Sequence, residues 1–369
     1  MSMTRRSILG LGLAMATAGC SFAPTTPGGQ PTPEDTTPPV TPKVDGDLVY
    51  FNWADYVDPE VFAAFEAEYK VKVIQSNFDS MESMVAKMNS GNAYDIIFPS
   101  AKWTQKLVAG GKLRKLDLKA MRHADAVYSG YSYFADPWYD AKSAHSVPFT
   151  MYKTGIGWRK DKLGELSGSW ADLWNPAAKG STFLLDDRDE VLGMIALKLG
   201  LPINTAEPGD LQKISAEIKG LRPSLRGFSS DDWGNLLNGS AHLTQAWSGD
   251  MVAILNEAED ASLYDFLEPK EGSPVNTDCY AIPMNAAHPG TAALFIDFML
   301  RPENVVKNMT YIGYPMPVKG TESDYEALVE ALPQCVVTVD DLKKDLMFQN
   351  GGTAAEQARD KAWTDAKAG

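Results

Sequence analysis

Carboxylates and aromatic rings lie together where two apolar runs of the sequence end. Trp53, Asp55 and Tyr56 follow the run 48–51, and the acidic stretch DDRDE at 186–190 follows the run 183–185. A core would accept the rings and exclude the acids, whereas a solvated loop would have no use for two large rings. A pocket for a ligand that is both apolar and positively charged needs both, because a buried cation must be paired and ring faces attract cations.

Other kinds of chemistry find little support in the sequence. It contains no P-loop, no Cys-x-x-Cys, no His-Glu-x-x-His and no Gly-x-Ser-x-Gly motif. Its four histidines stand in no metal-ligand spacing, so we predict no metal site, no cofactor and no catalytic residue. The carboxylates of DDRDE could in principle serve glycoside hydrolysis. They could also simply be charges that are favoured at a helix N-terminus.

The overall charge narrows the class of partner. The chain of 369 residues has 34 basic and 48 acidic side chains, a formal net charge of −14. This argues against nucleic acid as a partner, because phosphate binding needs a basic surface. A negative cleft attracts cationic ligands, although an acidic surface can equally serve solubility. The length allows two domains of ordinary size.

The first 20 residues are predicted to be an export signal rather than part of the fold. Arg5 and Arg6 precede an apolar stretch, and small residues lead up to Cys20. The paired arginines resemble a twin-arginine signal, so both the twin-arginine and the general secretory route stay open. The ending TAGC resembles a lipobox, which implies lipidation of Cys20 and a lipid anchor in the membrane. Otherwise Cys20 is a free thiol on a removed peptide.

The segment after the export signal is predicted to be a tether. Residues 21–46 are rich in Pro, Thr and Gly and have little to bury, which predicts a disordered tether.

Beyond Cys20 the chain has only Cys279 and Cys335, too few for a disulfide framework. Whether these two thiols pair stays open, because the sequence cannot place them within bridging distance.

From Asp47 onwards, strand-like and helical segments alternate. The first set predicts strands at 48–53, 70–78, 94–100 and 112–117, with helices at 59–69, 80–91 and 104–111. Asp58 is the expected N-cap of the first helix, and Pro59 takes its first helical position. A second set predicts strands near 183–185, 243–247 and 276–283, each followed by a helix, and a last helix within 351–369. This alternation predicts an α/β fold with helices on both faces of a parallel-type sheet. In such sheets ligands bind outside the strand ends.

Several motifs, in this order, resemble those of bacterial spermidine/putrescine-binding proteins. They are NWADYV, YDIIFPSAKW, SWADLWNP, LLDDRDEV, AWSGD, KEGSPVNTDCYAIP, FMLRPENV and YIGYPMP. Those proteins are the extracytoplasmic receptors of polyamine ABC importers, and the resemblance covers residues 47–369. It implies an α/β, two-lobed periplasmic-binding-protein fold (type II-like), with central mixed sheets flanked by helices and a ligand cleft between the lobes. We expect lobe 1 at 47–150 plus 276–304, and lobe 2 at 151–275 plus 305–369.

The resemblance also implies a set of ligand-binding residues. Asp250 matches putrescine-type members and Asp187 matches spermidine-type members, so the choice between a diamine and a triamine stays open. The alternative for the aromatic residues is a place in the core, and for the two serines a place in a turn. The predicted site consists of Trp53, Asp55, Tyr56, Ser100, Asp187, Glu190, Ser230, Trp247, Asp250, Asp278 and Gln349.

Two positions depart from the family pattern. Asn276 stands where a large aromatic is usual, which predicts micromolar rather than nanomolar affinity. Lys102 stands where spermidine-type members often have a tyrosine, and a lysine inside a site for polycations would be repulsive. We therefore expect Lys102 to point to solvent. The other possibility is that the ligand is shorter or different.

Together these observations predict a binding protein and not an enzyme. The resemblance implies a monomeric, lipid-anchored, extracytoplasmic receptor that delivers putrescine or spermidine to the permease subunits of an ABC importer. One alternative is the same fold serving another small cation or feeding a sensor. A remote alternative is a glycosidase that uses the DDRDE carboxylates.

Overall fold

A computed structural model of the protein describes residues 37–343 and 345–368. The signal peptide expected at 1–20, the lipidation expected at Cys20 and the tether up to residue 36 lie outside the described residues. Within the described part of the chain, no helix has the length and apolar character needed to cross a membrane.

Nine strands form one mixed sheet in the order β2-β1-β3-β9-β4-β7-β5-β6, with β8 paired to β4. Strands β1, β2 and β3 are mutually parallel, as are β5, β6 and β7, whereas β4 and β9 run antiparallel to their neighbours. The strands are β1 Leu48–Asn52, β2 Val73–Asn77, β3 Ile96–Ile97, β4 Ser146–Arg159, β5 Thr182–Leu184, β6 Leu225–Phe228, β7 Leu243–Trp247, β8 Tyr264–Leu267 and β9 Val275–Ala281.

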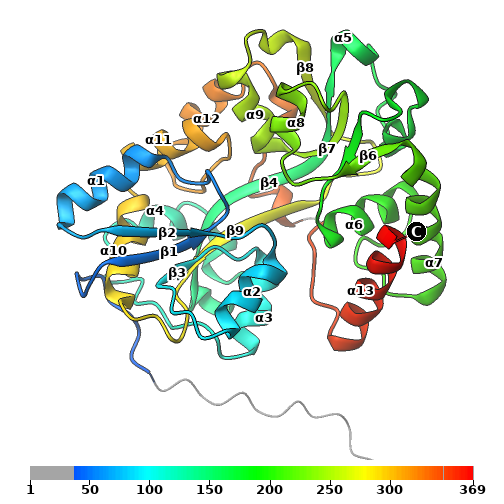
Figure 1. The fold of residues 1–369 in the computed structure, drawn as a ribbon. Helices are drawn as coiled ribbons and strands as arrows, with labels where there is room; N and C mark the ends of the chain where they lie inside the picture. The colour runs from blue at the N-terminus through cyan, green and yellow to red at the C-terminus, as the bar shows by residue number, and fades with distance from the viewer. Residues whose placement is uncertain (1–36, 344, 369) are drawn as a thin grey trace, which may run out of the picture. The chain divides into compact units, whose positions relative to one another are not determined.

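The long strand β4 joins two groups of strands (Figure 1). Its first part, 146–153, pairs with β9 on the side of β1, β2 and β3. In its second part, residues 154–158 pair with β7, and residues 156–159 pair with β8. The sequence 146–159 is buried along almost its whole length, as is β9, which is typical of strands covered on both faces.

Helices flank both groups of strands (Figure 1). Asp58 caps α1 by accepting a hydrogen bond from the backbone N–H of Glu60, and proline occupies the first turn, as the sequence predicted. The helices are α1 Pro59–Tyr69, α2 Met81–Asn89, α3 Ala101–Ala109, α4 Asp125–Tyr128, α5 Lys160–Leu163, α6 Arg188–Lys198, α7 Pro208–Leu221, α8 Asp232–Leu237, α9 Ser248–Glu257, α10 Pro289–Met299, α11 Pro302–Ile312, α12 Glu322–Leu328 and α13 Thr353–Ala368.

Three apolar clusters form the core of the described residues, and the first of them includes residues from both groups of strands. One cluster packs α1 and α10 against β1 and β9 through rings such as Phe65 and Phe295, whose centroids are 5.1 Å apart. Another packs α6, α7 and α13 around Trp170 and Ile195, which are fully buried. The α/β fold predicted from the sequence is confirmed.

Two predicted segments differ from the structure. The strand expected at 112–117 is reduced to two isolated bridges, at Leu113 and Leu116, because its backbone groups bond to three different segments instead of one partner strand. Residues 37–46, expected to be tether, contact the folded unit instead. Val40 is buried and bridges Leu116, and Asp45 accepts hydrogen bonds from the backbone N–H groups of Gly290 and Thr291.

The remaining cysteines are unpaired. Cys279 and Cys335 are both free and buried. Burial raises the pKa of both thiols above the ordinary range, so neither is activated as a nucleophile.

Candidate functional site

A cavity of about 640 Å³ lies where β1, β3 and β7 end, beside the first half of β9, and where the helices α3, α6 and α9 begin. Among its lining residues are all but one of the eleven that the sequence predicted. Gln349 is not among them, although its neighbour Phe348 is. The predicted residues that line the cavity are Trp53, Asp55, Tyr56, Ser100, Asp187, Glu190, Ser230, Trp247, Asp250 and Asp278.

The first wall is the turn that follows β1. The backbone N–H of Trp53 donates to the side-chain oxygen of the buried Asn52 at 2.8 Å, which turns the chain out of the strand. Asp55 has a φ of 52°, in the left-handed region that aspartate tolerates. Trp53 then packs edge-on against Phe78, with ring centroids 4.7 Å apart. Asp55 itself is exposed and lies at the mouth of the cavity.

Tyr56 connects this wall to the two central strands. Its hydroxyl lies 2.8 Å from the side-chain oxygen of Thr150 on β4 and 3.2 Å from the carboxylate of Asp278 on β9. Asp278 and Thr150 are partners in the antiparallel ladder, and Ser100 bridges Asp278 from the other side. Burial raises the pKa of Asp278 to about 7, against the lowering effect of the Tyr56 hydrogen bond.

A pair of carboxylates, Asp187 and Glu190, lies at the start of α6. One oxygen of Asp187 caps the helix by accepting from the backbone N–H groups of Asp189 and Glu190, at 2.8 and 3.0 Å. One oxygen of Glu190 accepts from the indole N–H of Trp247 at 3.2 Å, and its other oxygen is buried without a hydrogen-bond partner. Burial and repulsion from Asp189 raise the pKa of Asp187 to about 6, and burial and repulsion from Asp187 raise that of Glu190 to about 8.

A fourth interior carboxylate, Asp250, lies in the first turn of α9. It accepts a hydrogen bond from the hydroxyl of Tyr314 at 2.6 Å. Behind it lies the buried Asp232, which accepts from the backbone N–H of Trp247 at 3.0 Å and has one oxygen without a partner. Burial raises the pKa of both carboxyl groups, and repulsion from Asp250 adds to the rise at Asp232.

Several rings in the cavity were missed by the sequence reasoning. Tyr152 is the ladder partner of Asn276, and its ring lies 6.5 Å from that of Trp247 and 6.2 Å from that of Tyr314. Tyr152 therefore supplies an aromatic surface beside the position where Asn276 lacks one. Tyr314 belongs to the motif YIGYPMP, and its place after α11 gave no sign that it reaches the cavity. Trp103 and Trp233 also line it.

The expectation that Lys102 points to solvent is wrong. Lys102 lines the cavity and is only 2% exposed. Its ammonium lies 2.8 Å from the carboxylate of Asp189 and 2.9 Å from that of Glu356. It is buried because these two acids pair it, which meets the requirement for a buried charge.

The arrangement can hold a cation but is not arranged for metal chemistry. No group of described residues has the histidine, cysteine or carboxylate cluster that a metal ion needs. Asp187, Glu190, Asp250 and Asp278 form no ion pair with any described residue, although each has at least one hydrogen bond. Burial raises the pKa of Asp187, Glu190 and Asp278, as expected for carboxylates that have no paired cation.

Known proteins resemble this chain in sequence and structure. The family described as bacterial extracellular solute-binding protein matches residues 60–336. The spermidine/putrescine-binding periplasmic protein of Escherichia coli (strain K12) is 33% identical over 274 residues, 73% of this chain and 77% of that protein. The putrescine-binding periplasmic protein of the same strain is 29% identical over 343 residues, 87% of this chain and 91% of that protein.

Among solved structures, a spermidine/putrescine ABC transporter protein from Listeria monocytogenes superposes with a TM-score of 0.77 at 25% identity, covering 87% of this chain and 99% of that one. The resemblance found in the sequence motifs and the two-lobed fold class are thereby confirmed. The family consists of solute-binding proteins that act outside the cytoplasm, and it is not a family of enzymes. The chain belongs to the family of bacterial extracellular solute-binding proteins.

Proposed function

We propose that this protein binds a polyamine in its cavity and delivers it to the membrane permease of an ABC importer. One observation carries the proposal: four interior carboxylates without an ion-pair partner among the described residues face a cavity lined by aromatic rings. A polyamine supplies what is missing, since its ammonium groups pair the carboxylates and its methylene chain covers the rings. The names of the relatives in Escherichia coli support this ligand class.

Each predicted residue then has a role. Asp278 and Asp250 hold one end of the ligand, and Asp187 with Glu190 holds the other. Trp53, Tyr56 and Trp247 enclose the methylene chain, and each ring adds about 0.5–2 kcal/mol of cation–π attraction. The remaining residues contribute less. Asp55 at the mouth attracts cations, Ser100 and Ser230 offer polar contacts, and Gln349, near the end of the chain, offers a further polar contact.

The proposal includes closure of two lobes around the ligand. The boundaries near residues 150 and 276 fall inside β4 and at the start of β9, the strands that join the two groups, so these strands are the natural hinge. The boundary predicted at 304 falls within the continuous helix α11, which contacts α1, α10 and α9. We therefore move that boundary to the loop after α11.

The location and assembly of the protein complete the proposal. Export through the signal at 1–20 and lipidation of Cys20 would hold a monomeric receptor at the outer face of the membrane, close to its permease. Mass spectrometry of the membrane fraction tests this directly. A diacylglyceryl group on an N-terminal Cys20 is expected, and an unmodified chain released to the medium would contradict it.

Calorimetric titration of the purified protein with putrescine, cadaverine and spermidine tests the ligand. We expect saturable binding with a micromolar Kd, and loss of at least about 100-fold in affinity for Asp278→Asn, because a buried ammonium loses its charged partner. The control is Asp79→Asn, which removes an exposed acid from the mouth of the same cavity. No saturable heat with any of the three amines would overturn the proposal.

A further inference from the structure

Lys102 is the single cation among the described residues that line the cavity, where nine lining residues are acidic. It comes from the first turn of α3 and reaches the start of α6. Its burial to 2% exposure is unusual for lysine, which is almost never fully buried unless paired. A buried ammonium at an acidic cavity wall occupies a place where a ligand ammonium could otherwise sit.

Of the two carboxylates that Lys102 contacts, Asp189 is also paired with two arginines. Asp189 also pairs with Arg188 at 3.0 Å and with Arg359 at 3.2 Å. Burial alone would raise the pKa of Asp189, but Lys102, Arg359 and Arg188 hold it well below its usual range. Asp189 therefore stays ionised with no ligand present, whereas burial raises the pKa of its neighbours Asp187 and Glu190.

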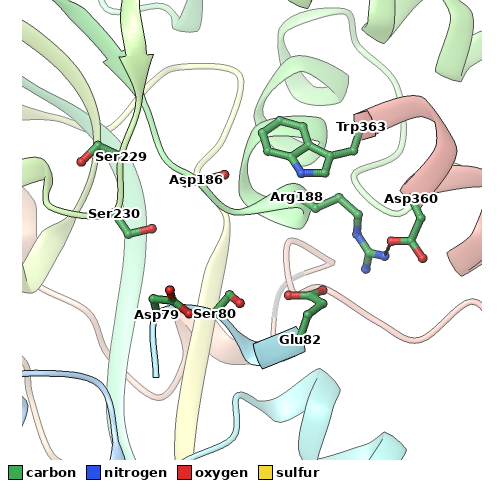
Figure 2. Close-up of a pocket in the computed structure, with 9 residues that line it drawn as sticks. All are labelled: Asp79, Ser80, Glu82, Asp186, Arg188, Ser229, Ser230, Asp360 and Trp363. Carbon is green, nitrogen blue, oxygen red and sulfur yellow. Dashed lines mark hydrogen bonds and ion pairs between the residues drawn. The ribbon is translucent and has the colours of Figure 1, made fainter. Parts of the chain in front are cut away.

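Beyond this end, the site adjoins a second pocket of about 410 Å³ (Figure 2). The two share Asp79 and Ser230, and the second pocket has the further acids Glu82, Asp186 and Asp360. Figure 2 shows the guanidinium of Arg188 directed at Asp360, with which it forms an ion pair. Protein cations thus stand on the acid-rich side of the cavity, where a longer ligand would place its next ammonium.

We propose that Lys102 acts as a built-in ammonium that limits the length of the ligand, so that the site prefers a diamine to a triamine. This inference rests on the proposed function and names the ligand class within it. Asp250 and Asp278 pair one ammonium, and Asp187 with Glu190 pairs the other. A third ammonium beside Asp189 would meet the ammonium of Lys102, which lies 2.8 Å from that carboxylate, and like charges at such distances repel strongly.

The test compares putrescine, cadaverine and spermidine by calorimetry, on the wild-type protein and three variants. Lys102→Met removes the charge and keeps an unbranched side chain, and Lys102→Arg keeps the charge. The matched control, Lys106→Met, removes the same charge one turn further along α3, where Lys106 also pairs with Glu356 but does not line the cavity. Thermal unfolding checks that each variant is folded.

We expect the wild-type protein, Lys102→Arg and Lys106→Met to bind a diamine at least about tenfold more tightly than spermidine. In Lys102→Met, the ratio of the spermidine Kd to the diamine Kd should fall by at least about tenfold. Tighter binding of spermidine than of both diamines by the wild-type protein would overturn the inference. A folded Lys102→Met protein in which the ratio of the spermidine Kd to the diamine Kd is unchanged would also overturn it. If none of the three amines binds, the proposed function itself is wrong.

Discussion

The hydroxyl of Tyr56 joins three elements at a single point of the site. It touches Thr150 on β4 and Asp278 on β9, while its ring packs edge-on against Phe149 and Tyr314 at 5.2 and 5.4 Å. As a donor to Asp278 it favours the ionised carboxylate, and so it opposes the effect of burial. The ring therefore shapes the cavity, and the hydroxyl prepares Asp278 for a cation.

The variant Tyr56→Phe separates these two roles. It keeps the ring and removes the hydrogen bond to Asp278, so we expect polyamine affinity at neutral pH to fall about tenfold, since hydrogen bonds to charged groups contribute about 1.5–3 kcal/mol. Calorimetry with putrescine measures the loss. The control is Tyr311→Phe, on a lining residue whose hydroxyl has no hydrogen bond within the described residues. Equal losses in both variants would contradict a specific role for the Tyr56 hydroxyl.

Residue by residue, the sequence predicted the acids better than the rings. Asp187, Asp250 and Asp278 were predicted because the motifs around them match site positions of the polyamine-binding family, and all three line the cavity. Tyr152 was missed because a tyrosine inside a buried strand is indistinguishable from a core residue. The fate of Lys102 could not be predicted, because its partner Glu356 is more than 250 residues away along the chain.

At the scale of elements, the end of α11 packs closely against the start of α9 beside the site. The helix α11 ends at Gly313, whose φ of 76° lies in the left-handed region, and α9 begins with Ser248 and Gly249. A Cβ added at Gly249 would lie 2.2 Å from the ring of Tyr314, and one added at Gly313 would lie 2.2 Å from the carbonyl oxygen of Gly249. The two glycines thus allow Tyr314 to reach Asp250.

The variant Gly249→Ala should disturb both stability and binding. Overpacking against Tyr314 should lower the free energy of unfolding by about 1–3 kcal/mol. Displacement of the tyrosine should weaken its bond to Asp250 and reduce putrescine affinity about tenfold. Urea denaturation and calorimetry measure the two effects.

The matched control is Gly220→Ala in α7, where an added Cβ meets no atom within 4 Å. It should be neutral or stabilise the protein by up to about 1 kcal/mol, because alanine is the better helix former. A folded Gly249→Ala protein that matched this control in both measurements would show that the close approach has no role in shaping the site.

Elements with a strong local pattern were predicted well, and elements that depend on distant partners were not. The helix α1 has a cap, a proline in its first turn and an apolar face, and its predicted start agrees with the structure. The segment 112–117 has the alternation of a strand, but its backbone partners Val40, Ala144 and Ile282 come from three parts of the chain. Local alternation indicates an extended segment and cannot say whether a neighbouring strand is present.

For the whole molecule, the carboxylates of the cavity make both the stability of the protein and its affinity for the ligand depend on pH. The pKa values of Asp187, Asp278 and Glu190 are raised to about 6, 7 and 8 in the folded, unliganded protein. Between about pH 5 and 8 the folded state therefore binds more protons than the unfolded state. Since stability then falls as pH rises, these groups make the unliganded protein less stable at pH 8 than at pH 5.

A bound diamine reverses this dependence. Its ammonium groups favour the ionised carboxylates, so binding releases protons and the affinity should increase as pH rises from about 5.5 to 8.5, while the amines stay charged as lysine does. We expect the rise in melting temperature caused by putrescine to be larger at pH 8.5 than at pH 5.5. Glu190→Gln should reduce that difference, whereas Glu257→Gln, on an exposed lining residue, should leave it unchanged. Differential scanning calorimetry across this range measures both, and a ligand-induced shift that shrinks as pH rises would mean that these carboxylates do not hold the cation.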